Sequence, residues 1–146
     1  MILGIYHINV NVTDLDRSRA FYEMLGFKVL EEFREVGNAK LDRGLALPRT
    51  DTRAYFLRIG SDRHSALIDL VQWQEPELVP TFPRLNQLGP ARIALRVKQL
   101  DRMYEDLRAK GVEFLSAPQT LDHLPLKPRF VVFRDPDGIL LELVEF

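Results

Sequence analysis

The sequence predicts an α+β protein built from two tandem β-α-β-β-β modules. Three observations predict it: an internal repeat, an alternation of apolar and polar residues typical of strands, and glycines placed where helices would end. The repeat aligns residues 7–17 with residues 92–102 without a gap, at an offset of 85. At the same offset Gly26 falls on Gly111. A register kept over this length indicates a duplicated supersecondary unit.

Each copy begins with a strand and continues into a helix. Residues 7–12 alternate between polar and apolar, which is the two-residue period of a half-buried strand. Thr13 and Asp14 then offer a helix N-cap, and Gly26 suits the left-handed backbone that often ends a helix. In the second copy, apolar residues recur on one helix face before the equivalent glycine, at Leu100, Met103, Tyr104 and Leu107.

Short apolar segments after each glycine predict the remaining strands. In the first copy they cover residues 27–33, 54–59 and 66–73, and in the second they cover residues 112–115, 130–134 and 139–146. Asp135-Pro136-Asp137-Gly138 predicts a hairpin turn between the last two, because proline presets one turn dihedral and glycine accepts a positive φ.

These elements predict one domain over residues 1–146, with modules at about 1–73 and 91–146. The linker between them, residues 74–90, carries four prolines, which oppose helices and central strands. Toward the end of each module the offset falls from 85 to 73, so the second copy is 12 residues shorter. We assign the difference to a loop at residues 38–53.

Composition excludes several classes of function. The formal net charge is −1 and the pI is about 6.3, so no global positive field attracts nucleic acid. Cysteine is absent, which excludes disulfides, thiolate zinc sites and cysteine nucleophiles. No window approaches the roughly 20 apolar residues that cross a bilayer. We therefore expect a cytoplasmic protein that binds neither nucleic acid nor membranes.

Charged residues interrupt the apolar pattern on one predicted sheet face. His7 and Arg92 hold equivalent places in the first strands of the two modules, and Asp69 and Glu142 hold equivalent places in the last strands. A charge flanked by apolar side chains is costly unless it is paired, coordinated or hydrated. If an approximate two-fold axis relates the modules, these four side chains converge on one concave surface. Taken singly, each is also compatible with a hydrated sheet face.

Three segments carry a resemblance to a known family: Asp14-Leu15-Asp16-Arg17-Ser18, Ala20-Phe21-Tyr22 through Leu25-Gly26-Phe27, and Phe133-Arg134-Asp135-Pro136-Asp137-Gly138 through Leu141-Glu142-Leu143. With the duplicated module, they resemble the vicinal oxygen chelate superfamily over essentially the whole chain. That superfamily includes glyoxalase I, methylmalonyl-CoA epimerase, extradiol dioxygenases, fosfomycin-resistance enzymes and bleomycin-resistance proteins. The resemblance implies one curved, mostly antiparallel eight-stranded sheet with helices on its outer face, and a homodimer.

The resemblance also implies a metal site. Carried over by position, its ligands are His7, Asp69 and Glu142. Arg92 stands where a second histidine is usual, and a guanidinium has no lone pair to offer a metal. The implied cofactor is one divalent ion, Mn, Ni, Fe, Zn or Mg, or none if the charge of Arg92 takes its place.

Two functions stay open. The first is a glyoxalase- or epimerase-like lyase or isomerase, in which vicinal oxygens of a small substrate chelate the metal and Glu142 moves a proton. Arg92 then holds a substrate carboxylate. The second is a metal-free binding protein of the bleomycin-resistance type, in which Arg92 pairs with Glu142 or Asp69 and the cavity takes an anionic or carbonyl-bearing ligand. An extradiol-type dioxygenase is disfavoured because Arg92 removes one histidine of the 2-His-1-carboxylate triad.

Overall fold

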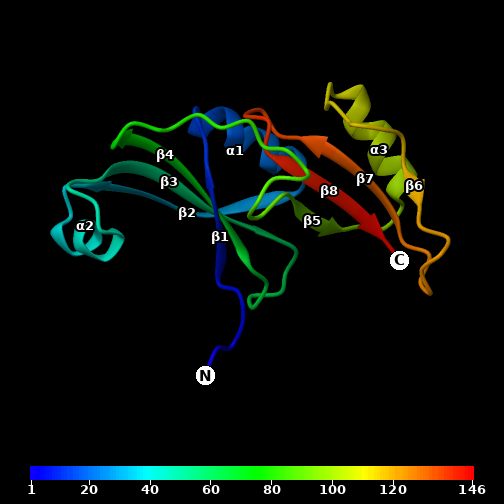
Figure 1. Ribbon diagram of the computed structural model, residues 1–146, viewed down its shortest axis with the longest axis horizontal. Helices are drawn as coiled ribbons and strands as arrows, with labels where there is room; N and C mark the ends of the chain where they lie inside the picture. The colour runs from blue at the N-terminus through cyan, green and yellow to red at the C-terminus, as the bar shows by residue number, and fades with distance from the viewer. The chain divides into compact units, whose positions relative to one another are not determined.

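The computed structural model describes residues 1–146, with eight strands and three helices (Figure 1). The chain divides into unit 1, Met1–Pro80, and unit 2, Thr81–Phe146. Each unit contains one four-stranded mixed sheet, which confirms the α+β class. The single eight-stranded sheet is not confirmed, because strand pairing divides the strands into two sheets of four.

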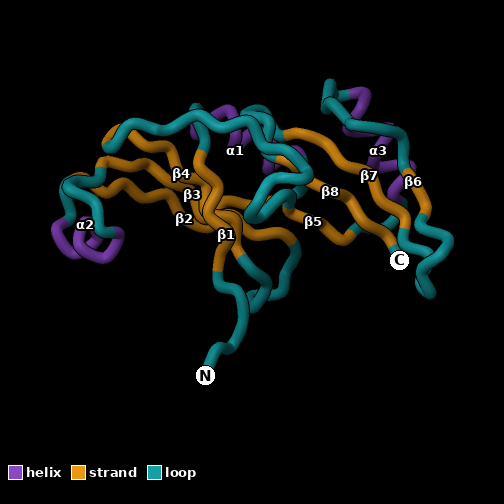
Figure 2. Tube along the Cα trace, viewed as in Figure 1, coloured by secondary structure: helices purple, strands orange, loops and turns teal.

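Unit 1 has four strands and two helices. Its elements in chain order are β1 (His7–Asn11), α1 (Leu15–Met24), β2 (Phe27–Val36), α2 (Ala39–Leu45), β3 (Asp51–Ile59) and β4 (Leu67–Glu75). The strand order is β1-β4-β3-β2, in which β1 runs parallel to β4 and the other neighbours are antiparallel. Figure 2 shows α1 against the sheet and α2 at the far end of β2 and β3.

Unit 2 repeats this plan in shorter form. Its elements are β5 (Ile93–Arg96), α3 (Leu100–Ala109), β6 (Gln119–Thr120), β7 (Arg129–Arg134) and β8 (Leu140–Glu145). The strand order β5-β8-β7-β6, with β5 parallel to β8, is the order of unit 1.

The repeat in the sequence is also a repeat in strand register. In unit 1, Asn9 of β1 lies opposite Asp69 of β4. In unit 2, Ala94 of β5 lies opposite Glu142 of β8. Asn9 and Ala94 are related by the offset of 85, and Asp69 and Glu142 by the offset of 73. Both modules therefore place their first and last strands side by side with the same residue alignment.

The first helix of each module also begins against the last strand in the same way. In unit 1 the backbone N–H of Leu15 donates to Oε1 of Gln72 at 3.0 Å. In unit 2 the N–H groups of Gln99 and Leu100 donate to the carboxylate of Glu145, at 2.5 and 3.4 Å. These bonds satisfy N–H groups that a helix start leaves without an intrahelical partner.

The cores lie between each helix and one face of its own sheet. The fully buried members of unit 1 are Val12, Leu15, Tyr22, Leu57 and Leu70. Those of unit 2 are Leu100, Val131, Phe133, Leu141 and Leu143. α1 and α3 have ten residues each, and none of the three helices is long and apolar enough to cross a bilayer.

Two local predictions are wrong. The segment 38–53 was expected to be a loop, but it contains α2, which buries no residue and so has no apolar periodicity to signal a helix. The predicted strand 112–115 forms only an isolated bridge, Phe114 to Phe133, and the pairing strand is instead β6.

The predicted hairpin turn between β7 and β8 is confirmed. Oδ1 of Asp135 accepts the N–H groups of Asp137 and Ile139 at 2.9 and 2.8 Å, and Gly138 adopts a φ of 83°. Positive φ is the conformation that glycine adopts without steric cost.

Candidate functional site

Strand pairing places a polar group on the sheet face of unit 1 that lies opposite α1. Residues 8, 10 and 12 of the first strand segment point toward the helix side, where Val10 and Val12 are buried. His7 and Asn9 point to the opposite face, together with Asp69 on the adjacent strand β4. The alternation of a β-strand thus separates the apolar core from a polar face.

Asp69 is the centre of this group. Its residue is only 8% exposed, and Nδ2 of Asn9 donates to its Oδ2 at 3.1 Å. Nε2 of His7 lies 4.0 Å from the same oxygen. The other oxygen, Oδ1, is buried and accepts no hydrogen bond. Burial raises the pKa of Asp69, although the hydrogen bond from Asn9 and the nearby His7 act in the opposite direction.

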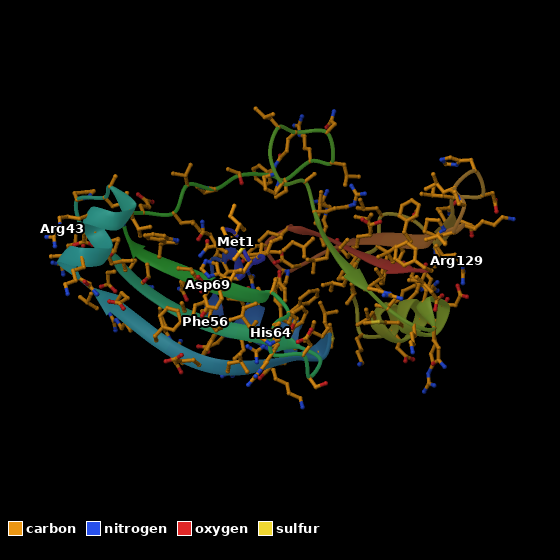
Figure 3. All side chains as sticks on the ribbon, turned by 90° about the horizontal axis from the view of Figure 1, so that it is seen from below. Met1, Arg43, Phe56, His64, Asp69 and Arg129 are labelled. Atoms are coloured by element: carbon orange, nitrogen blue, oxygen red, sulfur yellow. The ribbon has the colours of Figure 1, made fainter.

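Aromatic rings flank this carboxylate. Phe56 of β3 lies directly across from Asp69 in the sheet, and both side chains are labelled on the sheet of unit 1 in Figure 3. The ring of Phe56 is 5.8 Å from that of His7 and 4.9 Å from that of Phe33, measured between centroids. Apolar walls of this kind strengthen charge interactions by excluding water.

In unit 2 the equivalent positions form an ion pair. Nε of Arg92 donates to Oε2 of Glu142. The Glu142 residue is 8% exposed, like Asp69, but the guanidinium supplies the partner that Asp69 lacks. Arg96, on the same face of β5, carries no carboxylate partner, and its guanidinium lies 5.8 Å from the centroid of the exposed Phe146 ring.

The structure therefore brings the predicted site residues together in two pairs, His7 with Asp69 and Arg92 with Glu142. The convergence of the two pairs on one surface stays a prediction. The sequence reading did not single out Asn9 as part of the site, because a polar residue at this position is equally typical of a hydrated strand. Asn9 is identified as part of the site by its position opposite Asp69 in the parallel pairing of β1 with β4.

The pair in unit 1 fits a divalent ion as two of its ligands. The free Oδ1 of Asp69 and the imidazole of His7 are an oxygen and a nitrogen donor of the kinds that Mn, Fe, Ni and Zn accept. Glu142 fits less well while Arg92 occupies it. No group of three histidine, aspartate or glutamate side chains is gathered at one point. A three-ligand site thus requires a carboxylate beyond this pair.

Comparison with known proteins finds one matching family and two relatives that align along nearly the whole chain. The model of the Glyoxalase/Bleomycin resistance protein/Dioxygenase superfamily matches residues 4–143. An uncharacterized protein of Bacillus subtilis (strain 168), YwkD, is 33% identical, with 99% of this chain and 98% of that protein covered. A 2-epi-5-epi-valiolone epimerase of an Actinomyces species is 29% identical, with 97% and 79% covered.

Among solved structures, a glyoxalase family protein from Bacillus cereus matches with a TM-score of 0.86 and 20% identity, over 99% of this chain and 95% of that one. This likeness concerns the fold. The match of the family model over nearly the whole length agrees with the duplicated module seen in the strand register. The chain belongs to the Glyoxalase/Bleomycin resistance protein/Dioxygenase superfamily.

Proposed function

We propose that the protein is a glyoxalase- or epimerase-like lyase or isomerase that depends on a divalent metal and acts on a small, oxygen-rich substrate. The observation that carries this proposal is the buried, unpartnered Oδ1 of Asp69 beside His7. A buried carboxylate oxygen without a hydrogen-bond partner costs stability, and a bound cation offsets that cost. The 29% identity to a protein named as an epimerase supports the choice of reaction class.

In this proposal His7, Asp69 and Glu142 are the metal ligands. When bound, the ion supplies a Lewis acid that polarises the vicinal oxygens of the substrate. Glu142 comes from unit 2 of the same chain or of a second copy in a homodimer. Asn9 acts as a positioning residue, because its hydrogen bond fixes Oδ2 of Asp69 and leaves Oδ1 free to bind.

The proposed proton transfer uses Glu142 and Arg92. A carboxylate oxygen of Glu142 takes a proton from a substrate carbon next to a carbonyl, so that a C–H bond breaks, an O–H bond forms and the electron pair passes into an enediolate. Return of the proton from Glu142 to the neighbouring carbon completes an isomerisation, whereas an epimerisation requires a second acid that delivers a proton to the opposite face of the enediolate. Arg92 must release Glu142 for this step, and its guanidinium can then bind an anionic group of the substrate.

The test of this proposal is the metal content of protein purified without chelator. We expect about one divalent ion per chain in the wild type and its loss in Asp69→Asn. Asp106→Asn is the matched control, because Asp106 is an exposed carboxylate on a helix surface. Equal metal content in the two variants would contradict the assignment of Asp69 as a ligand.

The Arg92–Glu142 pair favours a second candidate, a metal-free binding protein of the bleomycin-resistance type. A guanidinium held beside a carboxylate places fixed positive charge in the site without a metal. If this candidate is correct, the purified protein contains no stoichiometric metal. Mn²⁺, Ni²⁺, Fe²⁺ and Zn²⁺ would then leave the Tm unchanged.

A further inference from the structure

We infer that Lys28 and Arg58 form an anion-binding subsite for a phosphate or carboxylate group, on the same sheet face of unit 1 as His7 and Asp69. The inference starts from strand register. Lys28 of β2 lies directly opposite Arg58 of β3. Two like charges at directly opposed positions destabilise a sheet, so this pair is costly unless something of opposite charge lies over it.

Arg58 lacks the carboxylate partner that two other arginines of unit 1, Arg34 and Arg49, have. Arg34 pairs with Asp51 at 3.3 Å, and Arg49 pairs with Glu75 at 2.9 Å. Nε of Arg58, by contrast, is buried and meets no acceptor, and no ion pair to Lys28 or Arg58 is present. A buried guanidinium nitrogen is a donor that an oxyanion satisfies, and a guanidinium matches carboxylate and phosphate geometry.

The pair faces the polar side of the sheet. Leu57, the neighbour of Arg58, is fully buried on the helix side and pairs with Ile68 of β4. Arg58 therefore points to the opposite face, the face that carries Asp69 and Phe56. Glu31 and Glu35 are the acidic residues of β2 on this face, and they lie across from Phe56 and Thr52 rather than from Arg58.

The subsite lies within reach of a small substrate held at His7. His7 pairs with Leu67 of β4, and Arg58 lies on the next strand, β3. Two strand spacings separate the backbones of His7 and Arg58, which is about 10 Å. The subsite also names a substrate class, and this step rests on the proposed function. The substrate is a small molecule whose anionic group lies over Lys28 and Arg58 while its oxygens lie at His7 and Asp69.

The test is an NMR titration of the ¹⁵N-labelled full-length protein with inorganic phosphate and, separately, with acetate. We expect saturable shifts of the Arg58 Nε–H resonance with at least one of the two anions. Whichever anion binds more tightly identifies the group. No shift of that resonance with either anion would overturn the inference.

Variants make the test specific. Arg58→Gln and Lys28→Gln are each expected to weaken anion binding about tenfold or more, as the loss of a charge-assisted hydrogen bond requires. Arg43→Gln is the matched control, since Arg43 is an exposed arginine on α2, at the far end of unit 1 in Figure 3. If Arg43→Gln and Arg58→Gln weaken anion binding equally, anion affinity depends only on the net charge of the protein and not on a subsite at Arg58.

Two further measurements keep folding and metal binding apart from this result. Lys28→Gln is expected to leave the Tm unchanged or to raise it, because it removes a like-charge contact. Asp69→Asn is expected to keep anion binding even where it loses metal. If the protein binds anions but contains no metal, the subsite is supported and only the metal-dependent function is rejected. If it binds metal but the Arg58 resonance does not respond to anions, the metal-dependent function is supported and the subsite is rejected.

Discussion

Asp69 is a buried carboxylate of which only one oxygen has a hydrogen-bond partner. One of its oxygens is satisfied by Asn9, and the other is buried without a partner, beside an imidazole and a phenylalanine ring. Leu67 and Val71, on the same face of β4, are buried. An apolar side chain at position 69 would therefore suit the fold at little cost in stability. The cost of this buried charge supports the proposal that Asp69 binds a metal.

The raised pKa of Asp69 predicts how its removal changes stability with pH. Because the folded state holds this proton more tightly, the unfolded chain ionises first as pH rises above the ordinary value of 3.8, and stability falls across that range. Asp69→Asn removes this loss. In the presence of a chelator, we expect the variant to be more stable than wild type by about 1 kcal/mol at neutral pH. The difference should vanish toward about pH 3, below the ordinary value. Urea unfolding at both pH values measures this, and an equal difference at both would contradict it.

Arg92 predicts a gain of metal affinity on substitution. Arg92→His replaces a guanidinium, which cannot bind a metal, by an imidazole at the position where the family usually has one. If Glu142 is a ligand, the variant should bind Ni²⁺ or Mn²⁺ about tenfold more tightly or better. Isothermal titration calorimetry measures the affinity. Arg96→His, on the same face of β5, is the control, and an equal gain there would argue against a site at Arg92.

The strand face of each site residue could be predicted from the sequence, but its neighbours on the adjacent strand could not. Alternation places His7 on one strand face, and the repeat relates Asp69 to Glu142. The partners of these residues depend on register, which the sequence leaves undetermined. The Asn9 contact and the opposed charges of Lys28 and Arg58 therefore emerge only from strand pairing.

At the scale of elements, strands and helices with a buried face were predictable, and elements without one were not. α1 and α3 bury apolar residues at helical spacing, and their glycine stops carry φ values of 102° at Gly26 and 88° at Gly111. α2 buries nothing, and its start depends on a local signal: Oδ1 of Asn38 accepts the N–H groups of Lys40 and Leu41. A hydrogen bond of that kind is also typical of a turn.

The start of α3 depends on a side chain of the last strand more than the start of α1 does. Asp14 caps α1 through its own side chain, whereas Gln99 forms no side-chain cap for α3 and leaves that role to Glu145. We expect Glu145→Ala to lower the free energy of unfolding by about 1–2 kcal/mol, the usual cost of a lost N-cap.

Glu105→Ala is the control for that measurement, because Glu105 lies on the exposed surface of α3. Chemical denaturation of both variants measures the difference. If the two lose the same stability, the carboxylate of Glu145 does not support the start of α3.

At the scale of the whole molecule, the site hypothesis requires His7 and Glu142 to approach each other, within one chain or between two copies. The protein has no cysteine, so a single pair can be introduced without background. We expect the double variant His7→Cys, Glu142→Cys to be joined by a short bis-thiol reagent in high yield. A product at the mass of one chain plus one linker, with both thiols consumed, indicates approach within the chain, and a product at twice the mass of one chain indicates approach between copies.

The double variant Arg43→Cys, Glu142→Cys controls for random collisions, because Arg43 lies on α2 and not on β1 or β4, the strands that carry His7 and Asp69. Similar yields for the two double variants would end the hypothesis that the first and last strands of the two modules share one site.

The identical register of the two modules has a consequence for how such a protein acquires new chemistry. Each position on the polar face has an equivalent position in the other module, because the strand register is the same. His7 corresponds to Arg92, and Asn9 corresponds to Ala94. After duplication of the gene segment, one copy can retain an older side chain while the other drifts to a different charge or size. Selection can then vary ligand preference one half at a time, with the packing of the core left as it was.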